Sequence, residues 1–363
     1  MLKMRTNIVR SGSRIVLPLL ISAVIYLPVS AGTSIDQGTA IDIEIAGLNE
    51  AAEQIQDLSD NFGPAFANAY ALSNISGYPL GSAHLGSFPH LFAGISINAG
   101  LANMQYFDSE ADTGKQVYPA FALNPVFYFG LGFSKKVDIM GKVMLFSDGF
   151  YRPPLDFEYA SLSKMNLYSI GGKIRYNAVS KKTILPGLFS LGGVTLSGGA
   201  DLLYGIVGVE GSYTYTLEGI EVDVGLPLTK QINVDFDPSY DLEISWFMVS
   251  LNAQALVYFD IFWIFTAYTG IGVVGTYGSF DMNINGSGEV TTDDSDYITN
   301  QGTDIIGTIS ALSDNKYNPY MIIPVYTVGF DINLFLIHLA LESMVNLRNG
   351  SDVNVQLGAR LQF

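Results

Sequence analysis

One glycine-rich run in this sequence has the spacing of a nucleotide-binding motif. GIGVVG, at residues 270–275, matches the dinucleotide fingerprint GxGxxG. That fingerprint needs a strand, a turn at the glycines and a helix whose N-terminus meets the pyrophosphate. Here the glycines lie inside an apolar extended stretch, and no helical pattern follows them. We therefore interpret them as small residues on an inner strand face or at strand bends.

Residue types that bind metals or carry nucleophilic catalysis are present without the matching spacing. Acidic residues gather in one polar stretch: Asp293, Asp294, Asp296 and Asp304. Their spacing departs from that of an EF-hand, so a solvated loop is the main interpretation and calcium binding within residues 290–304 is the alternative. The histidines are scattered and lack the spacing of zinc ligands: His84, His90 and His338. No GxSxG or SxxK motif is present, and these motifs mark serine nucleophiles. We expect no enzyme activity, no cofactor and no metal site.

The remaining candidate for a functional site is a set of polar side chains. They occupy every second position in segments that alternate between apolar and polar residues. A period of two is typical of a strand with one apolar and one polar face. If the apolar face meets lipid, the polar side chains face the lumen of a barrel, because a charge at mid-depth in lipid is costly. The set is Asp138, Lys142, Lys173, Arg175, Asp201, Asn252, Gln254, His338, Glu342 and Arg360. We expect these side chains either to pair with one another and with the N-terminal segment, or to tune a path for a ligand.

About ten extended segments carry this alternation from residue 88 onward. The last one, VNVQLGARLQF, is the clearest, with apolar residues at odd positions and polar residues or glycine at even positions. The segments are residues 91–101, 121–133, 137–146, 169–177, 194–210, 241–258, 262–280, 320–332, 335–347 and 353–363. The composition agrees with strands in a membrane, because the mean hydropathy is +0.29 and only 14% of residues are charged, against about 25% in soluble domains.

The connections between these segments alternate between short and long. Tight turns are expected at residues 134–136, 259–261 and 331–334, and long polar loops at 105–118, 147–163, 212–240 and 281–318. Short turns at one end and long loops at the other are typical of bacterial outer-membrane barrels. The sequence therefore predicts an all-β membrane protein, an antiparallel transmembrane barrel of about 10–14 strands.

The first 31 residues have the features of a secretory signal. Four basic residues precede an apolar run that ends in small residues at Ala31, so we expect cleavage before Gly32. A retained membrane anchor is the alternative, although the run is short for a spanning helix. The mature chain then has 14 basic and 34 acidic residues, a net charge of −20, which makes nucleic acid an unlikely partner. Cysteine is absent, so the fold has to be stable without disulfides.

Residues 32–87 follow a different pattern, with apolar residues at helical spacing. Gly63-Pro64 is expected to end this helix, and a second apolar run follows at residues 65–72. We predict a helical plug in the lumen or a periplasmic extension, with a mobile leader as the alternative. The residues expected to form the plug are Leu48, Ile55, Leu58, Phe62 and Phe66.

Residues 74–100, NISGYPLGSAHLGSFPHLFAGISINAG, resemble FadL-type outer-membrane barrels of the spirochaete-like branch. Within them FPHLFAG, at residues 88–94, approximates the PPHFGxG-like motif that opens the first strand of that family. Phe363 resembles the C-terminal signal that barrel-assembly machinery reads. The resemblance implies uptake of long-chain fatty acids or other hydrophobic small molecules through a barrel closed by an N-terminal hatch.

The resulting hypothesis is an exported protein of the outer membrane of a diderm bacterium. Residues 1–31 form the cleaved signal, 32–87 the helical plug and 88–363 the barrel. Expected partners are outer-membrane lipid, a hydrophobic small-molecule ligand and the barrel-assembly machinery, and a monomer is favoured. The alternatives are a surface-exposed structural or adhesive outer-membrane protein and a general porin.

Overall fold

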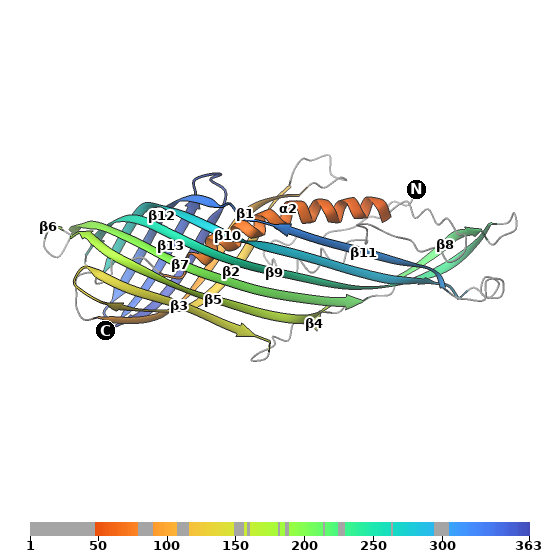
Figure 1. Cartoon of the computed structure of the whole chain (residues 1–363), viewed down its shortest axis with the longest axis horizontal. Helices are drawn as coiled ribbons and strands as arrows, with labels where there is room; N and C mark the ends of the chain where they lie inside the picture. The colour runs from red at the N-terminus through yellow and green to blue at the C-terminus, as the bar shows by residue number, and fades with distance from the viewer. Residues whose placement is uncertain are drawn as a thin grey trace.

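Antiparallel strands make up almost all of the described chain, and one helix accompanies them (Figure 1). The computed structural model describes residues 48–78, 90–106, 116–148, 156–157, 160–180, 182–185, 189–212, 215–223, 229–262, 264–293 and 305–363. The helix is α2 (Leu48–Asn74). The strands are β1 (Leu91–Tyr106), β2 (Gln116–Gly132), β3 (Val137–Ser147), β4 (Asp156–Phe157), β5 (Ala160–Val179), β6 (Lys182–Leu185), β7 (Phe189–Ser212), β8 (Tyr215–Asp223), β9 (Thr229–Ile261), β10 (Phe265–Thr291), β11 (Ile305–Tyr317), β12 (Ile322–Leu334), β13 (Ile337–Asn346) and β14 (Val353–Gln362).

Ten of the described strands close into a ring. The order is β10-β12-β13-β14-β1-β2-β3-β5-β7-β9, and β9 pairs with β10 to complete the circle. The first and last ring strands of the chain pair with each other, from Phe92 opposite Gln362 to Leu101 opposite Val353. The predicted fold class, an antiparallel transmembrane barrel of about 10–14 strands, is confirmed.

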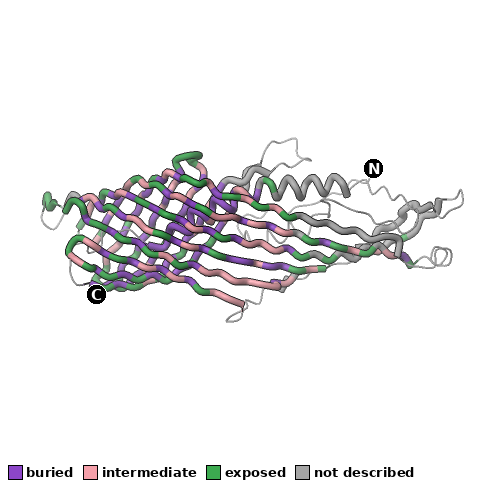
Figure 2. The backbone as a smooth tube through the Cα atoms, viewed as in Figure 1, coloured by how far each residue is buried: buried purple, intermediate pink, exposed green. Residues whose placement is uncertain are grey.

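The side chains of the ring alternate between an apolar outer face and an inner face that is shielded from solvent. On β14, Leu357 and Leu361 are exposed, whereas Gln356 and Arg360 are buried. Figure 2 shows the same alternation of exposed and buried residues around the ring. Along β10 the exposed apolar side chains run from Phe265 to Tyr277, which at ~3.3 Å per residue and a tilt of ~40° corresponds to a band ~30 Å tall. A band of this height matches the hydrocarbon core of a bilayer.

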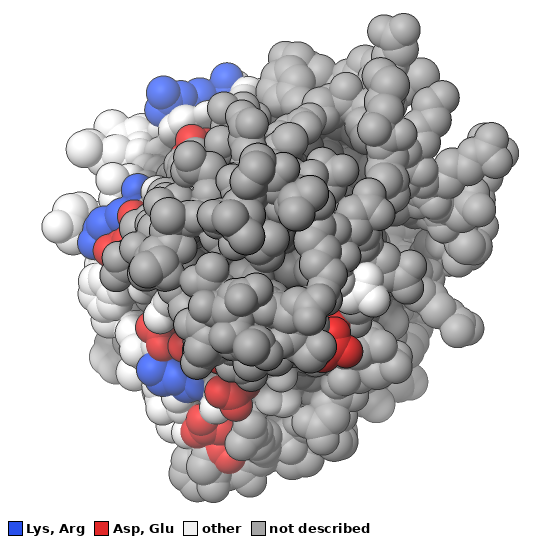
Figure 3. Space-filling view, turned by 90° about the vertical axis from the view of Figure 1, so that its right-hand side faces the viewer, with Lys and Arg blue, Asp and Glu red and all other residues white. Residues whose placement is uncertain are grey.

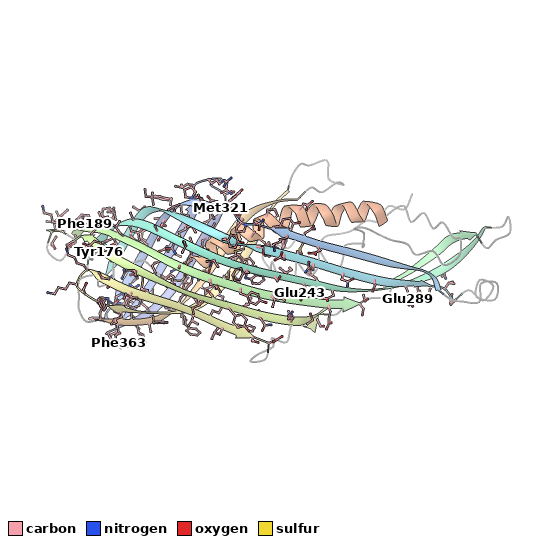
Figure 4. The ribbon with its side chains drawn as sticks, viewed as in Figure 1. Tyr176, Phe189, Glu243, Glu289, Met321 and Phe363 are labelled. Carbon is pink, nitrogen blue, oxygen red and sulfur yellow. The ribbon has the colours of Figure 1, made fainter. Side chains whose placement is uncertain are left out.

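One end of the ring carries the short turns and the start of β1. The backbone N–H of Leu91 donates to the carbonyl of Phe363 at 3.0 Å, and that of Phe363 donates to the carbonyl of Leu91 at 2.8 Å. In Figure 4, Phe363, Tyr176 and Phe189 mark this short-turn end, while Glu289 lies far toward the other end. Both ends of the ring's chain therefore return to the same mouth.

Two of the predicted tight turns are displaced from their true positions. β9 continues to Ile261 and β12 to Leu334, so the turns begin at Phe262 and Phe335. These two phenylalanines have φ angles of 51° and 55°, a left-handed conformation that favours glycine, asparagine or aspartate. The sequence thus lacks the usual turn residues at these positions, which explains the error.

Two of the predicted long loops are wrong, because residues 212–240 and 281–318 contain strands. β9 and β10 stay paired as far as Thr291 opposite Asp235, well beyond the apolar band. β8 pairs with the distal part of β9 and β11 with that of β10, so β8, β9, β10 and β11 form a ribbon that projects from the barrel (Figure 1). Outside the bilayer a strand needs no apolar face, so the hydrophobic period that identified the ring strands is missing here.

The helix is longer than predicted, because it continues through Pro64 to Asn74. The predicted end at Gly63-Pro64 is therefore wrong, and residues 65–72 belong to the same helix. Proline inside a helix removes one backbone hydrogen bond and costs about 3 kcal/mol or more. Contacts of α2 with seven strands of the sheet offset that cost. No helix among the described residues has the length and apolarity needed to cross a membrane.

Candidate functional site

The second half of α2 lies inside the ring and fills its interior with apolar side chains. This half of the helix contains small residues that are fully buried against the surrounding strands: Ala67, Ala69 and Ala71. A side chain on Gly100 of β1 would lie 2.0 Å from the carbonyl oxygen of Ala69, so the glycine allows the helix to contact the strand backbone. The surrounding cluster comes from opposite walls and includes Leu203, Trp246, Met248, Val274, Phe280, Met282, Ile323, Val325 and Met344.

Aromatic rings of the helix pack against aromatic rings of β9 and β10 in this half of the lumen. Phe66 stacks on Phe62 with ring centroids 3.9 Å apart and lies 5.5 Å from the ring of Phe280. Tyr70 stacks on Trp246 at 4.2 Å. Each such pair contributes about 0.5–1.5 kcal/mol beyond the area that it buries. The interior near the long connections is thus an aromatic and aliphatic surface that the helix covers.

The C-terminal end of α2 is held by a buried lysine. The ammonium group of Lys142 donates to the backbone carbonyls of Asn74 and Ser76, the latter at 2.7 Å, and forms an ion pair with Asp201 at 2.9 Å. The last carbonyls of a helix have no partner within the helix and carry partial negative charge. A cation at this position satisfies them and favours the helix end electrostatically.

Asp201 joins this lysine to the segment that follows the helix. Its carboxylate accepts from the Tyr78 hydroxyl at 3.0 Å and from the Asn252 amide at 2.9 Å. The Tyr78 ring lies 5.0 Å from Lys142 Nζ and 4.9 Å from Lys173 Nζ. We call Lys142, Asp201, Asn252 and Tyr78 the helix-end cluster.

Neighbouring strands add further bonds to the same stretch of backbone. Gln356 of β14 accepts from the backbone N–H of Gly77 at 2.9 Å. Asn354 donates to the Ser76 hydroxyl at 2.7 Å, and Asn124 of β2 donates to the carbonyl of Ser73 at 3.2 Å. Strands on several sides of the ring thus form hydrogen bonds with the end of the helix and the residues that follow it.

Between the helix end and the short turns, the interior contains oppositely charged pairs. Arg175 bonds Asp138 at 2.5 and 3.2 Å, and Arg360 bonds Asp331 at 2.7 Å. His90 lies 3.4 Å from Asp138. Tyr268 donates to Glu342 at 2.9 Å. The buried charges that the described ring strands carry are balanced, with four cations, Lys142, Lys173, Arg175 and Arg360, and four carboxylates, Asp138, Asp201, Asp331 and Glu342.

All ten residues that the sequence placed in the lumen are buried in the structure. They are Asp138, Lys142, Lys173, Arg175, Asp201, Asn252, Gln254, His338, Glu342 and Arg360. The helix-end cluster brings Lys142 and Asn252 together. Gln254 donates to the sulfur of Met344, and His338 lies 2.5 Å from the amide oxygen of Asn333. The site is therefore a set of bonded side chains on the inner wall, from strands that are adjacent or close together in the ring.

The remaining predicted positions divide between those that are described and those that are not. Phe62 and Phe66 are buried in the lumen. The helix α2 also contains Leu48, Ile55 and Leu58, but the structure does not describe their side chains. Four further predicted residues lie outside the described ranges: His84, Asp294, Asp296 and Asp304. The glycines of residues 270–275 lie within β10, paired on both sides. Within the described part of the chain, no group of three or more acidic or histidine side chains is arranged to hold a metal ion.

Sequence reasoning missed several residues of the site. Asp331 was assigned to a turn and Tyr78 was given no role within residues 32–87, yet both are buried and bonded to charged groups. Trp246 and Phe280 are buried aromatic residues on the inner face of their strands. The even-numbered residues of β10 face the lumen, and following this alternation as far as residue 280 would have identified Phe280. No local pattern indicated the role of Tyr78.

A family model described as Lsa36-like matches residues 30–363. The chain belongs to the Lsa36-like family. No curated protein sequence matches this Lsa36-like chain. Similar solved structures include the translocator domain of autotransporter NalP from Neisseria meningitidis, at 6% identity and a TM-score of 0.29, covering 86% of this chain and 98% of that one. They also include the Ralstonia pickettii toluene transporter TbuX, at 10% identity and a TM-score of 0.22, covering 83% and 93% of the two chains.

A Pseudomonas aeruginosa FadL homologue is among the matches as well, at 9% identity and a TM-score of 0.22, covering 82% of this chain and 97% of that one. At these identities and scores, the fold of the Lsa36-like chain rests on its own strand pairing, described above.

Proposed function

We propose that this Lsa36-like barrel takes up hydrophobic small molecules, such as long-chain fatty acids or similar lipids, across the outer membrane. One observation carries the proposal: the lumen half near the long connections is lined by aromatic and aliphatic side chains, and a single helix covers them. Lumen-facing residues of a wide aqueous pore are polar. An apolar inner surface instead suits a ligand that leaves water readily.

In this mechanism α2 is the movable element of the path. The ligand enters from the long-connection end and binds against Trp246 and Phe280 in place of Phe66 and Tyr70. The helix-end cluster then releases the segment that follows α2, and the ligand passes toward the short-turn end. The chemistry is binding and passage, with no bond made or broken.

The remaining partners of the proposal follow from the outer face and the last residue. Outer-membrane lipid contacts the exposed apolar band, a cleaved signal directs export, and the assembly machinery reads Phe363. The barrel acts as a monomer.

Reconstituted vesicles test the uptake proposal. Phe280 lines the lumen and Phe330 is 57% exposed on the outer face, so the same substitution at the two sites separates the path from general damage. We expect vesicles with the wild-type barrel or F330S to accumulate a fluorescent long-chain fatty acid faster than protein-free vesicles, and F280S to reduce that rate several-fold. Wild-type rates equal to those of protein-free vesicles contradict uptake, and equal losses in both variants contradict the assigned path.

A second candidate, a surface-exposed structural or adhesive protein, is favoured by the ribbon that extends past the apolar band. Figure 3 views the long-connection end and shows basic and acidic side chains at its rim. Ion pairs of the ribbon and adjacent strands include Lys164 with Glu243 at 3.2 Å and Lys316 with Asp281 at 3.6 Å. Binding of cells to an extracellular-matrix surface, lost when the ribbon is shortened and unaffected by F280S, would favour this function over uptake. The packed helix and the paired lumen charges argue against a general porin.

A further inference from the structure

Helix α2 has a defined direction inside the barrel. Its C-terminal end is bonded to Lys142, Asn124 and Gln356 in the interior of the ring. Toward its beginning, the carboxylate of Asp60 accepts a hydrogen bond from the Tyr317 hydroxyl at 3.0 Å. Tyr317 ends β11, which belongs to the projecting ribbon. The helix therefore runs inward from the long-connection mouth, and Figure 1 shows its beginning outside the ring on that side.

The next described stretch, from His90 onward, begins at the opposite mouth of the barrel. β1 starts at Leu91, whose backbone is bonded to that of Phe363 at the short-turn end. The adjacent His90 is buried beside Asp138 at the same end. Asp60 thus lies at the long-connection mouth, Ile75 and Tyr78 are buried inside the ring, and Leu91 lies at the short-turn mouth.

The usual orientation of outer-membrane barrels indicates which mouth of this barrel faces the cell exterior. Outer-membrane barrels place their short turns in the periplasm and their long connections outside. We infer that α2 enters the lumen from the cell exterior, so that the barrel displays the beginning of this helix on the outer surface. Display of the beginning of α2 is then a second function of the barrel, and it does not depend on uptake.

Close contacts along its path attach the helix to the barrel and allow it to act as a tether for the part that is displayed. A side chain on Gly63 would lie 2.0 Å from the Tyr317 ring, and one on Gly100 would meet the Ala69 carbonyl. Glycine at both positions permits backbone contact at the mouth and farther inside. The helix-end cluster fixes the inner end, so the tether has attachments at both ends of its path.

The route of α2 also distinguishes between a signal segment that is cleaved and one that is retained as a membrane anchor. A retained anchor in the inner membrane would hold the start of the chain on the periplasmic side, which is incompatible with a helix that begins outside. The inference therefore requires the signal to be cleaved. The intact mass of the purified protein reports this directly, and a mass that includes residues 1–31 overturns the inference.

Single-cysteine labelling tests the route, because the chain contains no cysteine. D60C probes the exposed position on α2, D314C is an exposed control on β11, and K135C is an exposed control in a short turn. We expect a membrane-impermeant maleimide to label D60C and D314C on intact cells and to label K135C only after the outer membrane is permeabilised. A gel shift between boiled and unboiled samples verifies that each variant has folded.

Three outcomes overturn the inference. If D60C, like K135C, is labelled only after the outer membrane is permeabilised, the beginning of the helix lies in the periplasm. D60C that stays protected while D314C reacts means that the helix does not emerge. K135C that reacts on intact cells while D314C does not means that the barrel has the opposite orientation. None of these outcomes depends on whether fatty acid is taken up, so display and uptake succeed or fail separately.

Discussion

The ion pair between Lys142 and Asp201 is expected to decide whether the end of α2 stays seated in the lumen. Both side chains are fully buried, and their charged groups are 2.9 Å apart. Replacing Asp201 by leucine leaves the ammonium group of Lys142 in the interior without its carboxylate. Removing one partner of a buried pair costs about 3–5 kcal/mol. At about 1.4 kcal/mol per factor of ten, the seated state loses roughly 10²- to 10³-fold in population relative to the released state.

Hydrogen exchange of peptides from the second half of α2 measures this loss in detergent-purified protein. We expect D201L and K142M each to accelerate exchange there by roughly two to three orders of magnitude if exchange proceeds through release. The double variant removes both charges, so its cost should be smaller than the sum of the single costs, with a coupling of about 1–3 kcal/mol.

The pair of Lys164 and Glu243 supplies the matched control. Its charged atoms are 3.2 Å apart, a similar distance, but the side chains are 45% and 38% exposed. Exposed pairs contribute at most about 1 kcal/mol, so E243Q should leave exchange in α2 unchanged. Wild-type exchange in D201L, or costs that simply add in the double variant, would refute the reasoning.

Three further predictions concern the helix, the lipid face and the last residue. G100V places a side chain against the Ala69 carbonyl, where even a Cβ lies 2.0 Å away, so we expect faster exchange in α2 with the barrel still folded; unchanged exchange contradicts the close contact. L357R puts a charge on the outer face near the middle of β14 and should lower barrel stability by about 2–4 kcal/mol, measured by urea unfolding in lipid vesicles, whereas a loss below 1 kcal/mol would place Leu357 away from the bilayer centre. F363A keeps the two backbone bonds to Leu91 and removes only the side chain, so slower assembly in cells with normal stability after refolding indicates an assembly signal, and normal assembly rules it out.

The ring strands could be predicted from the sequence because the bilayer imposes a simple rule on them. A strand with lipid on one side and the lumen on the other must alternate, and segments such as β14 show that alternation without a break. The same rule placed Lys142, Arg175 and Glu342 inside, since a charge in lipid is costly. The rule carries no information once a strand leaves the bilayer, which is why the distal parts of β9 and β10 were taken for loops.

Local signals also failed where tertiary contacts overrule them. Pro64 normally ends a helix, but α2 continues because the ring surrounds it on several sides. Phe262 and Phe335 occupy turn positions that their side chains do not favour, because the paired strands on either side determine where the chain must reverse.

The sequence by itself determined the class of the protein, the faces of most ring strands and part of the set of inward-facing residues, because alternation records which solvent each side chain meets. Only the tertiary structure decided which of these residues bind one another. Asp201 bonds Tyr78, far away in the chain, and Lys142 caps a helix that ends at Asn74. Such contacts depend on ring closure and strand register, which are set by all ten strands together and are not written in any one segment.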